Sequence, residues 1–477
     1  MIRPASIIWK KGLETMHTSR RSLAIVFIGL LCCMSGVQAQ TIGTSARITG
    51  MGNSSAGLVR GLDALNVNPA QLVPDENFTI SFGVLPFGAQ AGADFMTYEL
   101  YNKFFTGTIN EKGKRAPTYL STTDKNELLN SFSNETGHFS HDIRYTLFNA
   151  LLTTRFVTVA VGITERTGSN VALPRSYADF LLFGNPPGKR FDFNETRVSS
   201  TWTRDYSLSF AREVYASRGM SLLAGVSFKL VQGMAYFEVE RFNSHFVTDP
   251  ETFEVSGRAD LVARYAGTKD WLTSNNDFHY SLFPSPVGSG FGIDLGAHVR
   301  FNKNFSASLS FTDLGSVNWN SDVKEIVASE DFVISDLTDG SQMDEISERL
   351  NGNERAISSF STPLPSALVV AGVISIPNVP RRDDTWHFTF AWRQGFNNVA
   401  GNTTNPRIGL GTEIELLYNV AFRFGVNVGG IRPVTFGAGV GFIADNFKLD
   451  IGTMDITPHV SDRFSAVAVG VSSHWDI

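Results

Sequence analysis

Few residues in this sequence have the types and spacing that enzyme or cofactor chemistry needs. Gly290, Gly292 and Gly296 are spaced almost as in a dinucleotide-binding loop, where a strand-to-helix turn points backbone amides at a pyrophosphate. Here the alternation of apolar and small residues continues through all three glycines, which indicates a strand instead. No P-loop, zinc-protease or nucleophile-elbow motif occurs in the chain. The pattern therefore argues against nucleotide binding.

Two weaker patterns could bind a metal ion. His138 and His141 lie three residues apart, but no third ligand is evident, so a chance pair is the alternative. Asp331, Asp336 and Asp339 could hold calcium in an exposed loop if several oxygens converged there. No spacing singles out a nucleophile with its base. We therefore expect a protein without catalytic residues, without a metal site and without a cofactor, and not an enzyme.

Charged residues that alternate with apolar ones are the most informative polar groups. Buried charges are costly unless they are paired or hydrated, so such residues would line a lumen in ion-pair networks. Their simpler role is to fill that lumen. The alternative is that an arginine binds the polar end of an amphipathic ligand, because a guanidinium can take a carboxylate in bidentate fashion. The candidates are Asp205, Asp294, Arg300, Arg393, Glu413, Glu415 and Arg423.

These charges sit on segments with a strict period of two, which is typical of strands with two different faces. Residues 291–301, 420–428 and 436–442 place Phe, Val, Leu and Ile on one face, with Gly and charged residues on the other. We expect about 15 strands of ~9–12 residues, a length that suits tilted membrane strands better than soluble ones. A soluble sandwich is the alternative, but glycines beside unlike charges on one face and aromatics along the other favour a transmembrane barrel.

Composition agrees with a membrane barrel. Of 477 residues, 18% are charged, which is below the ~25% of an ordinary soluble domain. No apolar run after residue 40 is long enough for a helical span. The net charge of -6 and the lack of Lys/Arg-rich runs argue against nucleic-acid binding.

The first forty residues have the parts of a secretory signal peptide. Arg20 and Arg21 precede the apolar stretch Leu23–Met34, and the small residues Val37 and Ala39 follow at the cleavage positions. A membrane anchor and a lipoprotein site at the second of the two cysteines are the alternatives. Cleavage after Ala39 would remove both cysteines, so the mature chain would have no disulfide and no thiol chemistry.

Three domains follow from these patterns: a signal peptide at 1–39, an N-terminal hatch or plug at 40–75, and a barrel at 76–477. Long loops are expected at 98–140, 171–197 and 321–362, with short helices at 122–132 and 344–350. The predicted fold is all-β, a closed antiparallel transmembrane β-barrel with an N-terminal luminal hatch and a few short helices in loops.

The stretch 50–57, followed by Asp63-Ala64-Leu65 and by Asn68-Pro69-Ala70, resembles the N-terminus of FadL-like outer-membrane proteins. Residues 290–296 and 311–315, with Trp319, are similar to a FadL-like branch of unassigned function. The superfamily includes transporters of long-chain fatty acids and aromatic hydrocarbons, and barrels of type IX secretion. The resemblance implies about 14 strands and a hatch inside the barrel. The hatch residues would be Gly50, Gly52, Asn53, Ser54, Asn66, Asn68, Pro69 and Ala70.

From this resemblance we expect a protein of the cell outer membrane that takes up or exports hydrophobic or amphipathic, fatty-acid-like molecules. The alternative is a structural or secretion-associated barrel that anchors partner proteins. Expected partners are membrane lipids, a hydrophobic ligand, the barrel-assembly machinery, and secretion or surface proteins, with no nucleic acid and a monomeric state. The chain departs from many barrels at its end, because Trp475-Asp476-Ile477 stands where a terminal Phe is usual. No ligand-contact residue carries over, so the sequence does not name the ligand.

Overall fold

The structure is a computed structural model. It describes residues 45–74, 79–83, 86–109, 113–116, 119–132, 135–267, 284–335, 352–377, 385–416, 419–430, 432–444, 446–454 and 466–476. The predicted signal peptide, residues 40–44, Asp336 and Asp339 of the predicted calcium loop, and the predicted helix 344–350 lie outside the described residues. Among the helices that are described, none has the length and apolar character needed to cross a membrane.

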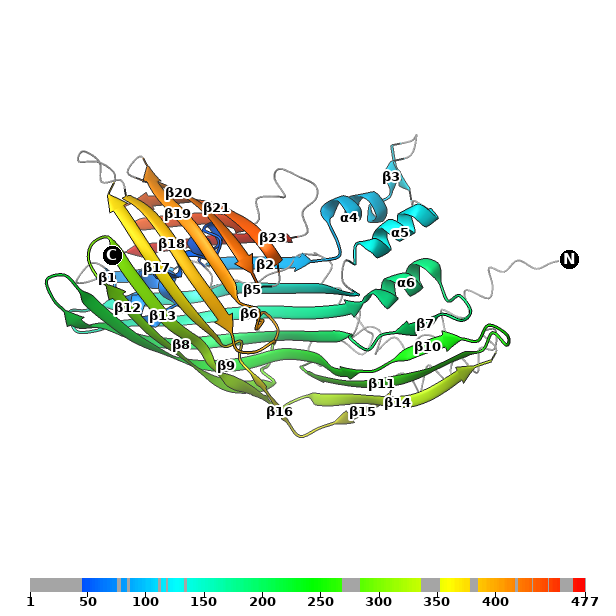
Figure 1. Ribbon diagram of the computed structural model, residues 1–477. Helices are drawn as coiled ribbons and strands as arrows, with labels where there is room; N and C mark the ends of the chain where they lie inside the picture. Colours follow the sequence, from blue (N-terminus) through cyan, green and yellow to red (C-terminus); the bar gives the residue numbers. More distant parts are fainter. Residues whose placement is uncertain are drawn as a thin grey trace.

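Fourteen antiparallel strands within the described residues close into a barrel, as predicted (Figure 1). The first strand consists of two pieces, β1 and β2, which both pair with β23 on one side and with β5 on the other. The remaining barrel strands then pair in chain order. Their bounds are β1 Thr79–Gly83, β2 Phe87–Ala93, β5 Thr136–Thr153, β6 Thr158–Pro174, β8 Arg197–Ala216, β9 Ser221–Phe242, β12 Gly288–Arg300, β13 Phe305–Trp319, β17 Ala367–Pro377, β18 Thr385–Gly395, β19 Arg407–Leu416, β20 Val420–Gly429, β21 Arg432–Ala444, β22 Phe447–Met454 and β23 Ala466–Asp476.

The two ends of the barrel differ. At one end the strands are joined by short turns, such as 154–157 and 301–304, and β23 ends there; we call this the short-turn end. At the other, the long-loop end, most of the connections are longer and carry structure of their own, on the right in Figure 1. In outer-membrane barrels short turns face the periplasm and long loops face outward. The elements in these connections are α4 Tyr98–Phe105, β3 Thr108–Ile109, β4 Arg115–Ala116, α5 Thr122–Asn130, α6 Arg175–Phe183, β7 Arg190–Asp192, β10 His245–Thr248, β11 Val255–Ala266, β14 Val323–Ile334, β15 Asn353–Ala356 and β16 Phe360–Pro363.

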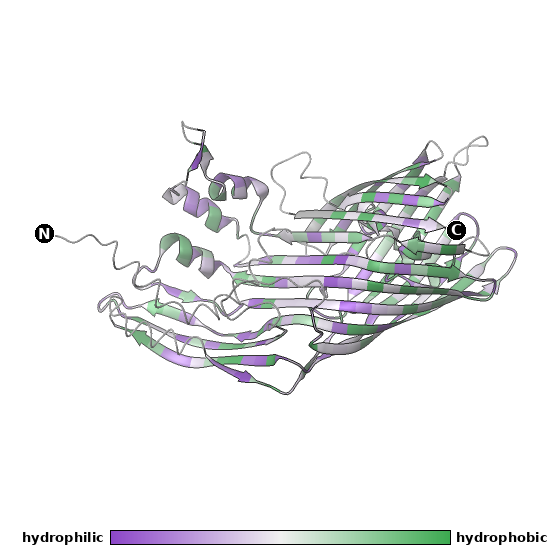
Figure 2. Ribbon diagram, turned by 180° about the vertical axis from the view of Figure 1, so that it is seen from behind, coloured by the Kyte–Doolittle hydropathy of each residue, from purple (hydrophilic) through white to green (hydrophobic). Residues whose placement is uncertain are grey.

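The barrel wall is apolar outside and polar inside. Along β20, Phe422 and Phe424 are exposed on the outer face, whereas Arg423 between them is 2% exposed. Figure 2 shows hydrophobic and hydrophilic residues alternating along the strands. A lipid-facing apolar band around a polar lumen accounts for this inside-out pattern.

One charged residue on the outer face finds its partner on the next strand. Arg204 interrupts the apolar face of β8 and forms an ion pair with Glu165 of β6, which lies directly opposite it. Trp202 Nε1 also donates to Glu165 Oε2 at 2.6 Å, and both carboxylate oxygens are thereby satisfied. Pairing makes the two buried charges tolerable on a wall that otherwise faces lipid.

The segments predicted as loops contain more regular structure than their composition indicated. α5 begins at a capping box, in which Ser121 and Asp124 bond each other's backbone N–H. The hydroxyl of Ser121, and then its backbone N–H, donate to the Asp124 carboxylate and hold the pKa of Asp124 below its ordinary value. The 321–362 segment contains β14, which pairs with β11 outside the barrel. Its charges meet opposite charges across that ladder, as at Arg264 and Glu325, 3.0 Å apart. Strands β7, β10, β11, β14 and β15 thus form an outer sheet that continues from the far part of β9.

Candidate functional site

The lumen is occupied by residues 45–74, which we call the luminal segment. It comprises the helix α3 (Ala46–Gly50) and three 3-10 turns, η1 (Ser55–Gly57), η2 (Gly61–Ala64) and η3 (Pro69–Leu72). α3 contacts β20 to β23, η1 contacts β17 and β18, and η3 contacts β8, β9 and β12, so the segment touches walls all round the barrel. Its apolar residues build the main buried cluster of the molecule, with members such as Val59, Leu65 and Leu72.

Wall glycines allow the backbone of the luminal segment to approach closely. A Cβ added at Gly425 would lie 2.1 Å from the backbone C and O of Met51, and one at Gly225 would lie 2.4 Å from the backbone C of Pro69. Gly437 and Gly452 make similar approaches. Glycine in the strands therefore serves close backbone contact rather than flexibility.

The conformation of the luminal segment follows from its sequence. Gly52 and Asn53 adopt successive left-handed conformations, with φ of 61° and 62°, and these are the residue types that tolerate such angles. Asn68 caps η3 by accepting a bond from the N–H of Ala70 at 3.0 Å, with Pro69 at the first position of the turn. Asn68, Pro69 and Ala70 thus form a defined turn. Of the eight residues named for the hatch, seven are buried and Asn66 is half-buried.

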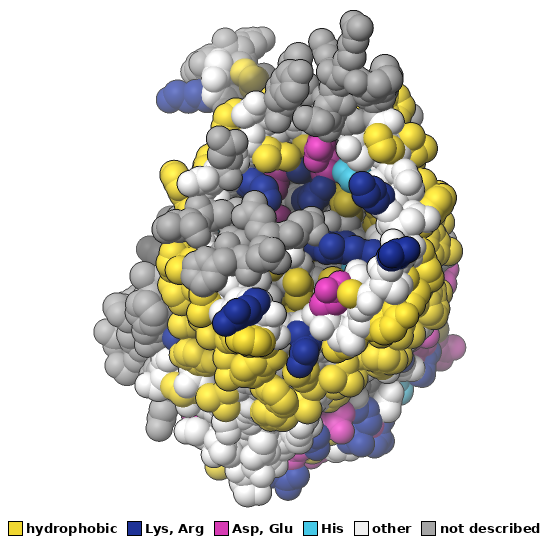
Figure 3. Space-filling view, turned by 90° about the vertical axis from the view of Figure 1, so that its left-hand side faces the viewer, with side chains coloured by type: hydrophobic (Ala, Val, Ile, Leu, Met, Phe, Trp, Pro, Cys, Tyr) yellow, Lys and Arg dark blue, Asp and Glu magenta, His cyan; other side chains and the backbone are white. Residues whose placement is uncertain are grey.

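Ion pairs tie the luminal segment to the C-terminal wall. Arg47 bonds Glu413, which is completely buried, with Nε and Oε2 2.8 Å apart. Arg423 bonds Glu413 as well, and also Asp450, at 2.5 and 2.6 Å. In Figure 3, which views the short-turn end, Lys and Arg side chains gather in the central hollow inside a hydrophobic rim. Each of these buried charges has an opposite charge, as burial requires.

A second charged cluster lies on the opposite wall. Arg144 bonds Asp142 at 3.0 Å, and Arg166 reaches Asp313 at 3.3 Å. The cluster continues through Lys229, which lies 2.6 Å from Asp313 and 2.7 Å from Asp294. Two cavities adjoin this cluster and share Arg166, Asp205 and Asp313.

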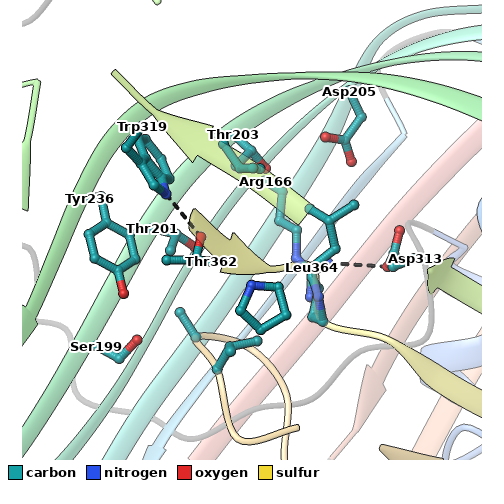
Figure 4. A pocket seen from close by; sticks show the side chains of 15 residues that line it. Arg166, Ser199, Thr201, Thr203, Asp205, Tyr236, Asp313, Trp319, Thr362 and Leu364 are labelled. Carbon is teal, nitrogen blue, oxygen red and sulfur yellow. Dashed lines mark hydrogen bonds and ion pairs between the residues drawn. The ribbon is translucent and has the colours of Figure 1, made fainter. Parts of the chain in front are cut away.

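The larger cavity, which we call the lumen pocket, has a volume of about 510 Å³ including its open mouth. Trp319, Tyr236 and Leu364 form one side, and Asp205 and Asp313 lie at the other (Figure 4). Trp319 is fixed by its Nε1, which donates to Thr362 Oγ1 at 2.9 Å. The smaller cavity, of about 300 Å³, lies between the charged cluster and Asn66 of the luminal segment. The pocket is therefore apolar at one end and charged at the end nearer the segment.

The barrel wall has an incomplete seam between β2 and β5. β1 pairs with β5 over five consecutive residues, but β2, as described, shares only the pair Ala93 and Phe139 with it. Residues 87–92 pair fully with β23 on the other side. β5 has a bulge between Thr146 and Phe148 at this level, and bulges commonly end local pairing. Few backbone hydrogen bonds therefore join β2 to β5 here.

A model of a protein family described as a family of unknown function, DUF5723, matches residues 69–453. The chain belongs to this family. The DUF5723 match begins at Pro69, inside the luminal segment, and spans the second charged cluster and the lumen pocket, but not Arg47 of the first network. No curated protein matches the sequence.

Among solved structures, this DUF5723 chain is similar to the Pseudomonas putida toluene transporter TodX, with 10% identity over 91% of this chain and 97% of that chain and a TM-score of 0.44. The Ralstonia pickettii toluene transporter TbuX is 11% identical over 91% of this chain and 97% of that chain, with a TM-score of 0.44. A Pseudomonas aeruginosa FadL homologue is 11% identical over 92% of this chain and 99% of that chain, with a TM-score of 0.42. These structures include FadL-type barrels, which the N-terminal motif resembles.

The seven charged residues named from the sequence of this DUF5723 member do not form one group. Asp294 joins the Lys229 cluster, while Glu413 and Arg423 belong to the network of Arg47. Arg393 lies opposite Arg407 on the next strand and donates to Asn402. The other three lie on the same lumen-facing rows: Asp205 at the lumen pocket, Arg300 at the short-turn end of β12, and Glu415 two residues beyond Glu413.

Among the described residues, one trio has ligand atoms close enough for a metal ion: His387, Glu413 and Glu415, within 4.8 Å of one another. Both oxygens of Glu413 already accept bonds from Arg47 and Arg423, and two guanidinium groups beside a site repel a cation. The two histidines considered as metal ligands have different surroundings: His138 bonds Asp94 at 2.9 Å, and His141 is buried. Asp331, considered as a calcium ligand, bonds Arg258.

Sequence reasoning missed much of the second cluster. Asp142, Arg144 and Arg166 lie on β5 and β6, in a stretch with polar residues on both faces, so alternation did not mark them. Asp313 was part of a motif noted only for its resemblance. The alternation of Ser199, Thr201, Thr203 and Asp205 on one face of β8 is the signal that could have located the pocket wall.

Proposed function

We propose that the protein is an outer-membrane channel that passes hydrophobic or amphipathic small molecules. The observation that carries this proposal is the lumen pocket, which lies between the luminal segment and the long-loop end. Its mixture of an apolar wall with a few polar groups is typical of a small-molecule site. The lipid-facing apolar band and the contrast between short turns and long loops support the outer-membrane location.

The two cavities suggest a route that the luminal segment closes. A compound entering from the long-loop end would occupy the lumen pocket and then the smaller cavity, where Asn66 of the segment lies. The luminal segment would act as the hatch. The seam between β2 and β5 supports a sideways exit into the membrane, because few backbone bonds must break there and unsatisfied backbone groups are costly in lipid.

A disulfide that fastens the luminal segment to the wall tests this route. Ser54 Oγ and Thr389 Oγ1 lie 2.6 Å apart, so cysteines at these two positions would place their sulfurs close together. Ser209 and Ser227 provide a matched control, because their hydroxyl oxygens are also 2.6 Å apart but join two wall strands. In a chain without the signal peptide no other cysteine would interfere.

The readout is accumulation of a long-chain fatty acid and of a neutral aromatic hydrocarbon by intact cells, compared with cells that lack the protein. We expect the oxidised Ser54–Thr389 pair to reduce accumulation to the level without protein and reduction of the disulfide to restore it. The Ser209–Ser227 pair should leave accumulation unchanged. Equal accumulation with the hatch fastened and free, for every compound, would show that the segment only seals the barrel.

The outer sheet supports a second candidate function, the anchoring of partner proteins. Val333 on β14 and Phe253 are more than half exposed, on a sheet that plays no part in closing the barrel. Exposed apolar groups of this kind mark interaction surfaces when they cluster. A photo-cross-linker at Val333 in intact cells would capture a protein partner if this function holds, and would give no specific adduct if it does not.

A further inference from the structure

One polar group at the lumen pocket has no partner of its own, the carboxylate of Asp205. Within the described part of the chain no hydrogen bond or ion pair reaches it, and its Oδ1 is buried without a hydrogen-bond partner. A buried acceptor left unsatisfied costs free energy, which a ligand that donates a hydrogen bond to it would recover.

The cations around Asp205 are already engaged with other carboxylates. Arg166 bonds Asp313, and Arg144 bonds Asp142. Lys229 bonds both Asp313 and Asp294, at 2.6 and 2.7 Å. This cluster therefore has three cations and four carboxylates, and Asp205 is the carboxylate that is left over. Arg393 and Arg407 lie opposite each other on β18 and β19, where Arg393 donates to Asn402 Oδ1 at 2.9 Å. Within the described residues neither forms an ion pair with Asp205.

The position of Asp205 places it on the path of any molecule in the lumen. It follows Ser199, Thr201 and Thr203 along the inner row of β8, so hydroxyl groups line the wall that leads to it (Figure 4). It also borders the smaller cavity beside Asn66. The apolar side of the pocket, at Trp319, lies away from it (Figure 4). A molecule with its hydrophobic body at Trp319 would thus point its other end at Asp205.

We propose that Asp205 accepts the polar head of the compound held in the lumen pocket, and that this head is a hydrogen-bond donor, an ammonium or a hydroxyl group, rather than a carboxylate. The proposal rests on the proposed function and deepens it by naming the substrate class. A carboxylate head would meet Asp205 as a like charge, while Arg144 and Arg166 are already paired with Asp142 and Asp313. A site built around one unsatisfied buried acceptor discriminates strongly against ligands that cannot donate to it.

Three probes with one aromatic body and different heads test the proposal: 3-phenylpropylamine, 3-phenylpropanol and 3-phenylpropanoate. Binding to the full chain in lipid nanodiscs is measured by calorimetry for the unmodified protein, Asp205→Asn and the control Asp331→Asn. Asp331 lies on the outer sheet, so the same chemical change there is remote from the pocket. We expect the amine to bind at least about tenfold more tightly than the carboxylate, and Asp205→Asn to abolish that difference. Asp331→Asn should preserve it.

Asp205→Glu keeps the charge and should keep the preference for the amine, which separates recognition from a general loss of folding. Tightest binding of phenylpropanoate, or an unchanged order of affinities in Asp205→Asn, would overturn the proposal and assign the head to the arginines. Accumulation of the same probes by cells separates the two hypotheses. Donor-selective binding without accumulation would refute the channel and leave the role of Asp205 intact. Accumulation that does not depend on Asp205 would refute head-group recognition by Asp205 and leave the channel function intact. If none of the probes binds, both hypotheses are refuted.

Discussion

Replacing Gly425 by alanine should loosen the luminal segment from the barrel wall. The new Cβ would lie 2.1 Å from the backbone C and O of Met51, far inside van der Waals contact, and neither backbone can swing aside as a side chain could. Overpacking of this kind costs about 1–3 kcal/mol. Because the clash exists only while the segment is docked, the equilibrium between docked and undocked forms should shift by about 5- to 150-fold.

Thiol labelling measures that shift. Ser55 is completely buried and its Oγ has no hydrogen-bond partner, so Ser55→Cys adds a reporter with little loss of its own. In Gly425→Ala the labelling rate of this cysteine should rise by about 5- to 150-fold, the shift expected in the docking equilibrium. Gly372→Ala is the matched control, because a Cβ at Gly372 meets nothing closer than Ser306 O at 3.9 Å.

Two results would refute the reasoning. One is a labelling rate in Gly425→Ala equal to that in Gly372→Ala, which would mean that the segment and wall do not meet as described. The other concerns a chain that lacks residues 40–68. Gly425→Ala should lower the unfolding free energy of the complete protein but not that of the truncated chain. An equal loss in both would show that the clash is not with the luminal segment.

Three further perturbations follow from the same geometry. Val426→Arg should destabilise the barrel by about 2–4 kcal/mol in urea-dependent refolding if Val426 is near the bilayer midplane, and a negligible cost at that depth would reverse the assignment of the two faces. Arg423→Met should cost about 3–5 kcal/mol by the same assay, because it removes the guanidinium that pairs with the buried Asp450; an unchanged midpoint would contradict the pairing. Arg355 and Arg264 hold the pKa of Glu325 below its ordinary value of 4.5, so its stabilisation of the outer sheet is present above that pH and lost as the pH falls through the lowered value. Hydrogen exchange of β14 should show this loss, and Glu325→Gln should remove the pH dependence.

The sequence was sufficient for the direction of each barrel side chain but not for its partner. Arg423 and Phe424 are neighbours, and alternation alone places one in the lumen and the other toward lipid. Arg166 and Asp313, in contrast, are 147 residues apart, and their contact depends on the curvature of the closed barrel. Arg204 broke the alternation because its partner, Glu165, is supplied by the adjacent strand. Periodicity carries no information about such pairing.

Strand β14 of the outer sheet escaped sequence analysis for a different reason. A strand in the membrane must have one apolar face, which produces a clear period of two. β14 pairs with β11 away from the barrel, where both faces can be polar, so its charged composition indicated a loop. The lumen pocket was equally hidden, because its walls come from β8, β13 and residues near Leu364, which lie far apart in the chain.

The docking of α3 also has a consequence for how the protein folds. Most of its contacts are with β20 to β23, the last strands along the chain, and the Ala46 N–H donates to Ser472 Oγ across 426 residues of chain. Contacts of such separation form late, because the entropy of closing the loop must be lost before they contribute. We therefore expect the luminal segment to be the last part of the chain to acquire its native contacts, because they form only after β20 to β23 have folded. Pulse-labelling of Ser55→Cys during refolding should therefore show protection only after β23 has paired with β2. The luminal segment, although it precedes every barrel strand in the sequence, would dock only once the barrel has closed.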